Sequence, residues 1–99
     1  LYLASSEGLF SFNTQQNTYR TLSEKGVLCD NFHILAKYND LILIGTDRGL
    51  YMMSRKDENI VPFKKELLNK NIMDICPARK GIWVATEGHG LFYISDDGR

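Results

Sequence analysis

The side chains able to take part in chemistry lie in short polar turns of the sequence. Glu87 and His89 stand in one glycine-rich turn, and Asp47 and Arg48 form an acidic–basic pair in an earlier one. Carboxylate, imidazole and guanidinium groups can hydrogen-bond the hydroxyls or charges of a ligand. His33 lies between two apolar residues, where it either faces a ligand channel or is a satisfied structural histidine. For His89 the alternative is a solvated turn residue.

The sequence contains no pattern typical of a catalytic or metal site. Its two histidines have no Ser or Cys nearby in a nucleophile context, and its carboxylates fall in turns instead of forming a convergent pair. Cys29 and Cys76 lack a second Cys or His at the spacing of zinc ligands. We therefore expect no catalytic residue, no metal and no cofactor. Both cysteines are expected to be partly buried thiols, with a disulfide between them as the alternative in an oxidising compartment.

Composition and charge exclude further function classes. The 99 residues contain 12 Lys and Arg against 12 Asp and Glu, so the formal net charge is zero. A dedicated nucleic-acid binder usually carries a basic patch, so we expect no nucleic-acid partner. The longest aliphatic run, at 41–44, is far shorter than the roughly 20 residues that span a bilayer, so we expect no membrane contact. With no targeting leader in view, the chain is expected to be an excerpt of a longer protein.

An internal repeat of about 41 residues determines where these turns lie. Its signature is a Gly–Leu–aromatic triplet, preceded by a large apolar, an aliphatic, a small and a hydroxyl residue. The triplets begin at Gly8, Gly49 and Gly90. Further upstream, Asn31 and Asn71 open matching apolar segments, and local turn hydrogen bonds are the expected role of both. Three copies therefore cover nearly the whole chain.

Each copy has the features of strands and hairpins. The segments are short, rich in β-branched and aromatic residues, and bounded by Gly, Asp and Asn. The stretch 63–70 is predicted to connect two copies, with at most a turn or two of helix. First strands are predicted at 32–37 and 72–77, second strands at 1–5, 41–46 and 82–86, third strands at 9–13, 50–54 and 91–95, and fourth strands at 18–22 and 60–64.

A unit of four antiparallel strands in about 40 residues has the size of a β-propeller blade. The predicted fold is therefore all-β, a β-propeller fragment of about two and a half four-stranded antiparallel blades. Within one domain, 1–99, we expect a partial blade at 1–22, a complete blade at 31–64 and a partial blade at 71–99. A closed ring typically needs four to eight blades. We expect the others in a longer parent chain, and the alternative is that several copies complete one another.

Stacked blades would cover both faces of each sheet, which explains why the run 41–44 is apolar throughout. The recurring aromatic residues are predicted to pack between blades, although aromatic rings also form sugar-binding platforms. These aromatic residues are Phe10, Tyr51, Trp83 and Phe92. The turns between second and third strands are predicted to share one face of the disc with the stretches 23–31 and 65–71. The residues of those turns are Glu7, Asp47, Arg48, Glu87 and His89.

The third copy, 81–92, resembles the two-component regulator propeller repeat. The resemblance is carried by Trp83 and the three residues after it, by the turn 87–89 and by the triplet 90–92. The segment 71–75 fits the inner strand of that family, and the resemblance extends over essentially all 99 residues. The first two copies depart from the pattern, with Tyr2 and Leu43 in place of the tryptophan.

The resemblance implies the periplasmic sensor region of a hybrid two-component histidine kinase. Such a region would be a non-enzymatic module that detects an oligosaccharide or a similar small molecule and signals across the membrane to control transcription. Its implied partners are the remaining blades of the propeller, a glycan ligand and a second copy of the chain. For ligand binding we select His89, Glu87, Asp47, Arg48 and His33.

Other propeller functions are the alternative. The chain would then belong to a protein-interaction scaffold, or be a fragment of a propeller glycoside hydrolase or lyase. The run 95–98 falls one residue short of the Asp-box turn of sialidase-type propellers, and a hairpin turn explains it equally well. Because its blade edges are unpaired, the isolated segment is expected to aggregate or to exchange strands.

Overall fold

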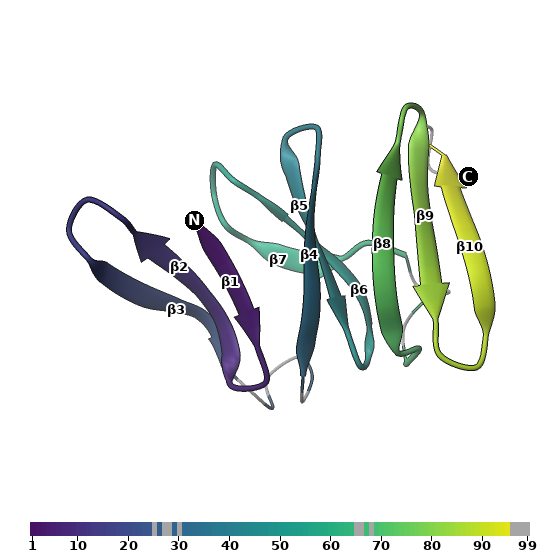
Figure 1. Ribbon diagram of the computed structural model, residues 1–99, viewed down its shortest axis with the longest axis horizontal. Coiled ribbons are helices and arrows are strands. Elements are labelled where there is room, and N and C mark those ends of the chain that lie inside the picture. Colours follow the sequence, from purple (N-terminus) through teal and green to yellow (C-terminus); the bar gives the residue numbers. More distant parts are fainter. Residues whose placement is uncertain (25, 27–28, 30, 65–66, 68, 96–99) are drawn as a thin grey trace.

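The computed structural model describes residues 1–24, 26, 29, 31–64, 67 and 69–95. These residues form three antiparallel sheets of three, four and three strands, which confirms the expected all-β class. No closure of the sheets into a ring is seen among them. The sheets follow one another along the chain, with the N-terminus beside the first and the C-terminus beside the third (Figure 1).

The strands lie close to the predicted ranges. The first sheet has the order β1 (Tyr2–Ser5), β2 (Gly8–Asn13) and β3 (Thr18–Glu24). The middle sheet has the order β4 (Phe32–Tyr38), β5 (Leu41–Thr46), β6 (Gly49–Ser54) and β7 (Ile60–Pro62). The third sheet has the order β8 (Ile72–Ala78), β9 (Gly81–Thr86) and β10 (Gly90–Ser95).

Three expected segments fall partly outside the described residues. The residues left out are 65, 66 and 68 of the connection at 63–70, 96–98 of the run that resembles an Asp-box, and 25, 27, 28 and 30 of the stretch 23–31. Within the described part of the connection, Leu67 is 2% exposed and belongs to the core. Where described, the chain has no helix long and apolar enough to cross a bilayer.

The hydroxyl residue and the glycine of the repeat build the tight turn that joins the second and third strands of each copy. In the middle sheet, the Thr46 hydroxyl donates to the Gly49 carbonyl at 2.8 Å and accepts the Arg48 N–H at 3.0 Å. The other two copies repeat the first of these bonds, from Ser5 to Gly8 at 3.3 Å and from Thr86 to Gly90 at 2.8 Å. All three glycines have a positive φ, of 152°, 117° and 87° in chain order, which favours glycine at this position.

Both faces of the middle sheet are buried, as the apolar run at 41–44 predicts. One face packs against the first sheet in a cluster that includes Ile42, Ile44, Tyr51 and Met53. The other face packs against the third sheet in a cluster centred on residues that are nearly inaccessible to solvent. That second cluster contains Leu43, Leu50, Leu67, Ile72, Ile75, Ile82, Val84 and Ile94. Alternate residues of one strand thus serve two interfaces, because successive side chains point to opposite faces.

The small residue of the repeat lies where the next sheet approaches most closely. A Cβ atom added to Gly45 would lie 2.6 Å from Ile34 Cγ2 and 2.8 Å from Ile72 Cγ2. Contacts that close exclude a larger side chain unless a neighbour moves. Ile72 is the first residue of β8, so the third sheet packs on the middle one mainly through its first strand, β8.

A polar contact also joins the first sheet to the middle one. Glu58, in the turn between β6 and β7, accepts a hydrogen bond from the Tyr2 hydroxyl at 3.0 Å and forms an ion pair with Arg20. The hydrogen bond from Arg20, together with its positive charge, holds the pKa of the Glu58 carboxyl below its usual value. Burial and the adjacent Glu58 carboxylate raise the pKa of Tyr2.

The aromatic residues and the thiols differ in exposure from what the sequence suggests. Trp83 was expected between sheets, and this stays a prediction, because it is 43% exposed on a face of β9 that no described sheet covers. Phe10 is only partly buried and lines an open apolar hollow with Leu3 and Tyr19. The cysteines form no disulfide, since Cys29 is a buried free thiol and Cys76 an exposed one. Only Cys29 therefore matches the expected buried state.

Candidate functional site

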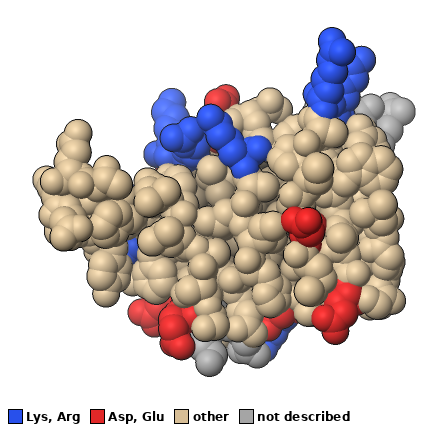
Figure 2. Space-filling view, viewed as in Figure 1, with Lys and Arg blue, Asp and Glu red and all other residues tan. Residues whose placement is uncertain are grey.

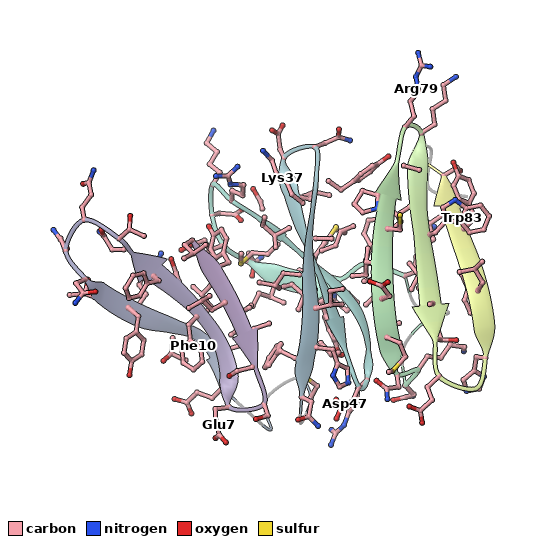
Figure 3. The ribbon with its side chains drawn as sticks, in the orientation of Figure 1. Glu7, Phe10, Lys37, Asp47, Arg79 and Trp83 are labelled. Atoms are coloured by element: carbon pink, nitrogen blue, oxygen red, sulfur yellow. The ribbon has the colours of Figure 1, made fainter. Side chains whose placement is uncertain are left out.

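The turns between second and third strands lie together at one end of the three sheets, as predicted. Figure 3 shows Glu7 and Asp47 at this end, and Lys37 and Arg79 at the opposite end. The β9–β10 turn, which carries Glu87 and the two residues after it, lies at the same end as the β5–β6 turn (Figure 1). We call this end, with residues 5–8, 31, 46–49, 71 and 86–90, the turn end. The expected neighbouring stretches 23–31 and 65–71 are described only in part.

An asparagine holds the acidic residue of the turn in two of the copies. Asn31 Nδ2 donates to Asp47 Oδ2 at 3.3 Å, and Asn71 Nδ2 donates to Glu87 Oε2 at 3.3 Å. The backbone repeats the link, because the Asp47 N–H donates to the Asn31 carbonyl and the Glu87 N–H to the Asn71 carbonyl, at 3.2 and 2.9 Å. Each acidic residue is thus linked to the asparagine before a first strand by two bonds, one to its carboxylate and one from its backbone N–H.

These asparagines play a role that differs from the expected one. Local turn hydrogen bonds were expected, whereas the amide groups of Asn31 and Asn71 reach a carboxylate 16 residues further along the chain. The spacing is a signal that was available in the sequence, because both copies have the acid at the same distance from the asparagine. Its meaning depends on an antiparallel register that brings the start of the first strand beside the end of the second.

The basic residues of the turns follow these carboxylates in the sequence, Arg48 directly and His89 after one glycine. Arg48 and His89 are exposed, and each directly precedes the glycine of its copy. In the first copy Glu7 has this position, so the three turns do not present identical chemistry. The Asp47–Arg48 and Glu87–His89 turns each offer one acceptor group and one donor group side by side.

His33 is exposed on β4 and does not have the buried surroundings of a structural histidine. It lies where the pairing of β4 with β5 shifts register, between Phe32 and Ile34. The same irregularity occurs in β8 between Ile72 and Asp74. A bulge re-aims the side chain at its position, and here His33 is exposed two residues after Asn31.

Charge is distributed unevenly between the two ends of the sheets. Figure 2 shows most Lys and Arg side chains of the visible face at one end and most Asp and Glu side chains at the other. The turn end holds Glu7, Asp47 and Glu87, whereas Arg79 and Lys80 occupy the β8–β9 turn at the opposite end. A ligand at the turn end would therefore meet more carboxylates than cationic groups.

The turn end is an open surface without metal-binding geometry. Among the described residues, no three His, Cys, Asp or Glu side chains come together as metal ligands do. A hollow of about 520 Å³ lies elsewhere, along the β2–β3 hairpin, where only Arg20 is charged and Glu58 already pairs with it. What this end can do chemically is to hold the hydroxyl or amine groups of a ligand by hydrogen bonds.

The chain was compared with family models, curated proteins and solved structures. No family model, no curated protein and no solved structure matches this chain. The repeat, the stacking of the sheets and the geometry of the turn end are therefore the grounds for any inference about function.

Proposed function

We propose that the chain is a ligand-sensing segment of a β-propeller, and that the turn end binds a neutral oligosaccharide or a similar polyhydroxylated molecule. The propeller architecture is proposed in addition to the three antiparallel sheets that the structure contains. It is supported by the repeat length, by the order of four strands in the middle sheet and by the stacking of consecutive sheets through equivalent faces. A closed ring of four to eight such sheets is the usual propeller architecture.

The observation that carries the ligand class is the repeated asparagine–carboxylate pair. Asp47 and Glu87 are each held by an amide and by a backbone bond, so their oxygens are positioned before a ligand arrives. Vicinal sugar hydroxyls can donate to such carboxylates and accept from a neighbouring amide, guanidinium or imidazole group. Preorganised groups lose less entropy on binding, which favours affinity.

The charge at the turn end indicates which class of oligosaccharide can bind there. With Glu7, Asp47 and Glu87 together, an anionic ligand would bring like charges close to one another, which costs free energy. A neutral sugar has no such cost. We therefore place neutral oligosaccharides ahead of acidic ones, with Arg48, His89 and His33 as the donors that complete recognition.

In the proposed setting, the segment binds without catalysing a reaction and belongs to the periplasmic part of a hybrid histidine kinase. Ligand binding would bias the kinase across the membrane and so control transcription. This setting is supported only by the resemblance of the repeat, since fold and function are not tied to one another. A propeller scaffold or a propeller glycosidase remains the alternative.

A thermal-shift screen of neutral and acidic oligosaccharides tests the proposal. A ligand at ten times its Kd adds about 1.4 kcal/mol to the stability of the native state, from RT ln(1 + [L]/Kd). For a domain of this size, that corresponds to a rise in Tm of roughly 6 °C or more. We expect such a rise with a neutral oligosaccharide. No rise with any saccharide would contradict the proposal, and hydrolysis of the saccharide would favour the glycosidase alternative.

Two variants make the screen specific to the turn end. The double variant Asp47→Asn and Glu87→Gln keeps the size of both side chains and removes their charge, so we expect it to lose most of the ligand-induced shift. Asp40→Asn removes an exposed carboxylate from the β4–β5 turn at the opposite end and is the matched control. An equal shift in both variants would show that the ligand binds elsewhere.

A further inference from the structure

The third sheet exposes an apolar face that no described residue covers. We call it the β9–β10 end face and define it by Trp83, Ala85, Leu91 and Tyr93. The register pairs Trp83 with Tyr93 and Ala85 with Leu91, and cross-strand partners share one face of a sheet. The rings of Trp83 and Tyr93 are in contact, with centroids 4.8 Å apart. Trp83, Leu91 and Tyr93 thus place large apolar side chains in contact with solvent on one face.

The repeat shows how the same positions behave where a sheet does follow. Leu91 is 64% exposed, whereas Leu9 and Leu50, at the same position of the earlier copies, are 0% exposed. Trp83 is 43% exposed, whereas Leu43 at its position is 0% exposed. The earlier faces are covered by the next sheet along the chain. The end face therefore has the residue types of an interface between sheets.

The covered faces also show which part of the next sheet makes the contact. Ile72, at the start of β8, lies so close to Gly45 that an added Cβ would be 2.8 Å from its Cγ2 atom. In the earlier interface, Phe32 at the start of β4 is 3% exposed and packs in the cluster that Ala4 joins. A sheet that covers such a face therefore packs against it with its first strand. The first residue of that strand is large and apolar and lies over the small residue of the repeat.

We propose that the β9–β10 end face is the docking surface for a further antiparallel sheet of this same repeat, whose first strand places a large apolar residue over Ala85. The inference rests on the propeller fold of the proposed function and adds the surface and the chemistry of its partner. Phe32 and Ile72 show the kind of residue required at the contact point.

The first sheet of a second copy does not meet this requirement. That sheet begins, among the described residues, with β1, which corresponds to the second strand of a copy. Its exposed face is lined by Leu3, Phe10, Phe12 and Tyr19, with no strand in the place of β4 or β8. A second copy would therefore bury some apolar area but would not make the contact that Ile72 makes with Gly45.

One charged residue, Asp74, lies on the same face as the apolar residues of the proposed interface. Its register partner is Ala85, and Ile34 has its position in the middle sheet. The Asp74 carboxylate is exposed and accepts the N–H of Ile75 at 2.9 Å. A covering sheet must leave this carboxylate in contact with water or meet it with a donor. The interface is thus centred on Trp83, Leu91 and Tyr93.

An extended chain tests the proposal directly. In this chain, a duplicate of residues 59–95 is appended after Arg99. Ser54 and Ser95 share a repeat position, so the residue that follows Arg99 corresponds to Asn59, and the 41-residue spacing of the repeat continues into the duplicate. The tryptophan of the duplicate is replaced by leucine, so that Trp83 stays the sole tryptophan. We expect its emission to shift to shorter wavelength and its quenching by acrylamide to fall several-fold relative to the unextended chain.

A matched control separates docking from mere addition of chain. In a second extended chain, the isoleucine of the duplicate that corresponds to Ile72 is replaced by aspartate. A buried, unpaired carboxylate is strongly disfavoured, so quenching of Trp83 should remain that of the unextended chain. This control uses the same length and nearly the same composition.

Three results would overturn the proposal. One is a folded extended chain whose Trp83 is quenched as before. A second is an extended chain that does not fold, because the repeat's own sheet must fit this face. The third is a dimer of the unextended chain with Trp83 shielded, which would make a second copy the occupant. No measurement here includes a saccharide, so failure of the ligand screen would leave this test unaffected.

Discussion

Replacing Leu50 and Leu91 by alanine, one at a time, compares the same repeat position in two surroundings. Leu50 is 0% exposed between the middle and third sheets, and Leu91 is 64% exposed on the end face. Both are leucines in the third strand of a copy and directly follow the repeat glycine. Any difference between the two variants therefore reports the covering sheet and not the residue type or the strand.

The magnitude follows from burial. Leu→Ala removes three carbons, worth about 2.4 kcal/mol at roughly 0.8 kcal/mol per buried CH₂. At Leu50 the cavity adds to this loss, so we expect a total of about 3–4 kcal/mol, within the usual range for buried leucines. At Leu91 only about a third of the side chain is shielded, so we expect Leu91→Ala to lower the free energy of unfolding by under ~1 kcal/mol. This substitution creates no cavity.

Urea unfolding, followed by far-UV circular dichroism at low protein concentration, measures both free energies of unfolding. Leu50→Val, which removes one carbon at a cost of about 1 kcal/mol, covers the case in which Leu50→Ala leaves too little stability to fit a transition. Leu9→Ala, in the first sheet, should match Leu50→Ala because Leu9 is also 0% exposed. Equal losses for Leu50→Ala and Leu91→Ala would refute the stacking argument.

Three further predictions concern the turns, the contact between the first two sheets and the thiols. Thr46→Val removes a fully buried hydroxyl that bonds two backbone groups, so urea unfolding should show a loss of ~1–3 kcal/mol; the same change at the more exposed Thr86 should cost clearly less, and the reverse order would be inconsistent with the turn geometry. Arg20 lowers the pKa of Glu58 in the folded chain, so the wild type should be more stable than Glu58→Gln by a constant amount above the usual glutamate pKa of 4.5. That difference in stability should vanish as pH falls through the lower, folded-state pKa of Glu58. Urea unfolding of both proteins across acidic pH measures the difference, and a difference that grows on acidification would contradict the prediction. With a thiol reagent such as DTNB, exposed Cys76 should react at once in the native chain and buried Cys29 only on unfolding, since burial also raises the pKa of its thiol; immediate reaction of both thiols would contradict the buried position of Cys29.

The strands and their order could be predicted because the pattern of the repeat is redundant. Three copies show the same glycine triplet and the same hydroxyl residue, and the hydroxyl in fact donates to the glycine carbonyl in each copy. The apolar run at 41–44 also gave the correct interpretation of a sheet buried on both faces, because alternation of polar and apolar residues is lost there. Local chemistry and periodicity were sufficient for these features.

Features that depend on neighbours could not be read from the same pattern. Trp83 has an aromatic side chain at an interface position, yet its burial depends on a covering sheet that the described residues do not supply. The pairing of Asn31 with Asp47 depends on strand register, which one sequence does not show. Likewise, no periodicity indicates that Glu58 bonds Tyr2 and Arg20 across two sheets.

The packing of consecutive sheets can be tested most directly at Gly45. The structure brings the Ile72 Cγ2 methyl group against the Gly45 backbone, where an added Cβ would be 2.8 Å away. In an assigned nuclear Overhauser spectrum of the folded chain, we expect a strong cross-peak between this methyl group and the Gly45 Hα protons. A folded chain with both resonances assigned and no such cross-peak would contradict the stacking of the third sheet on the middle one.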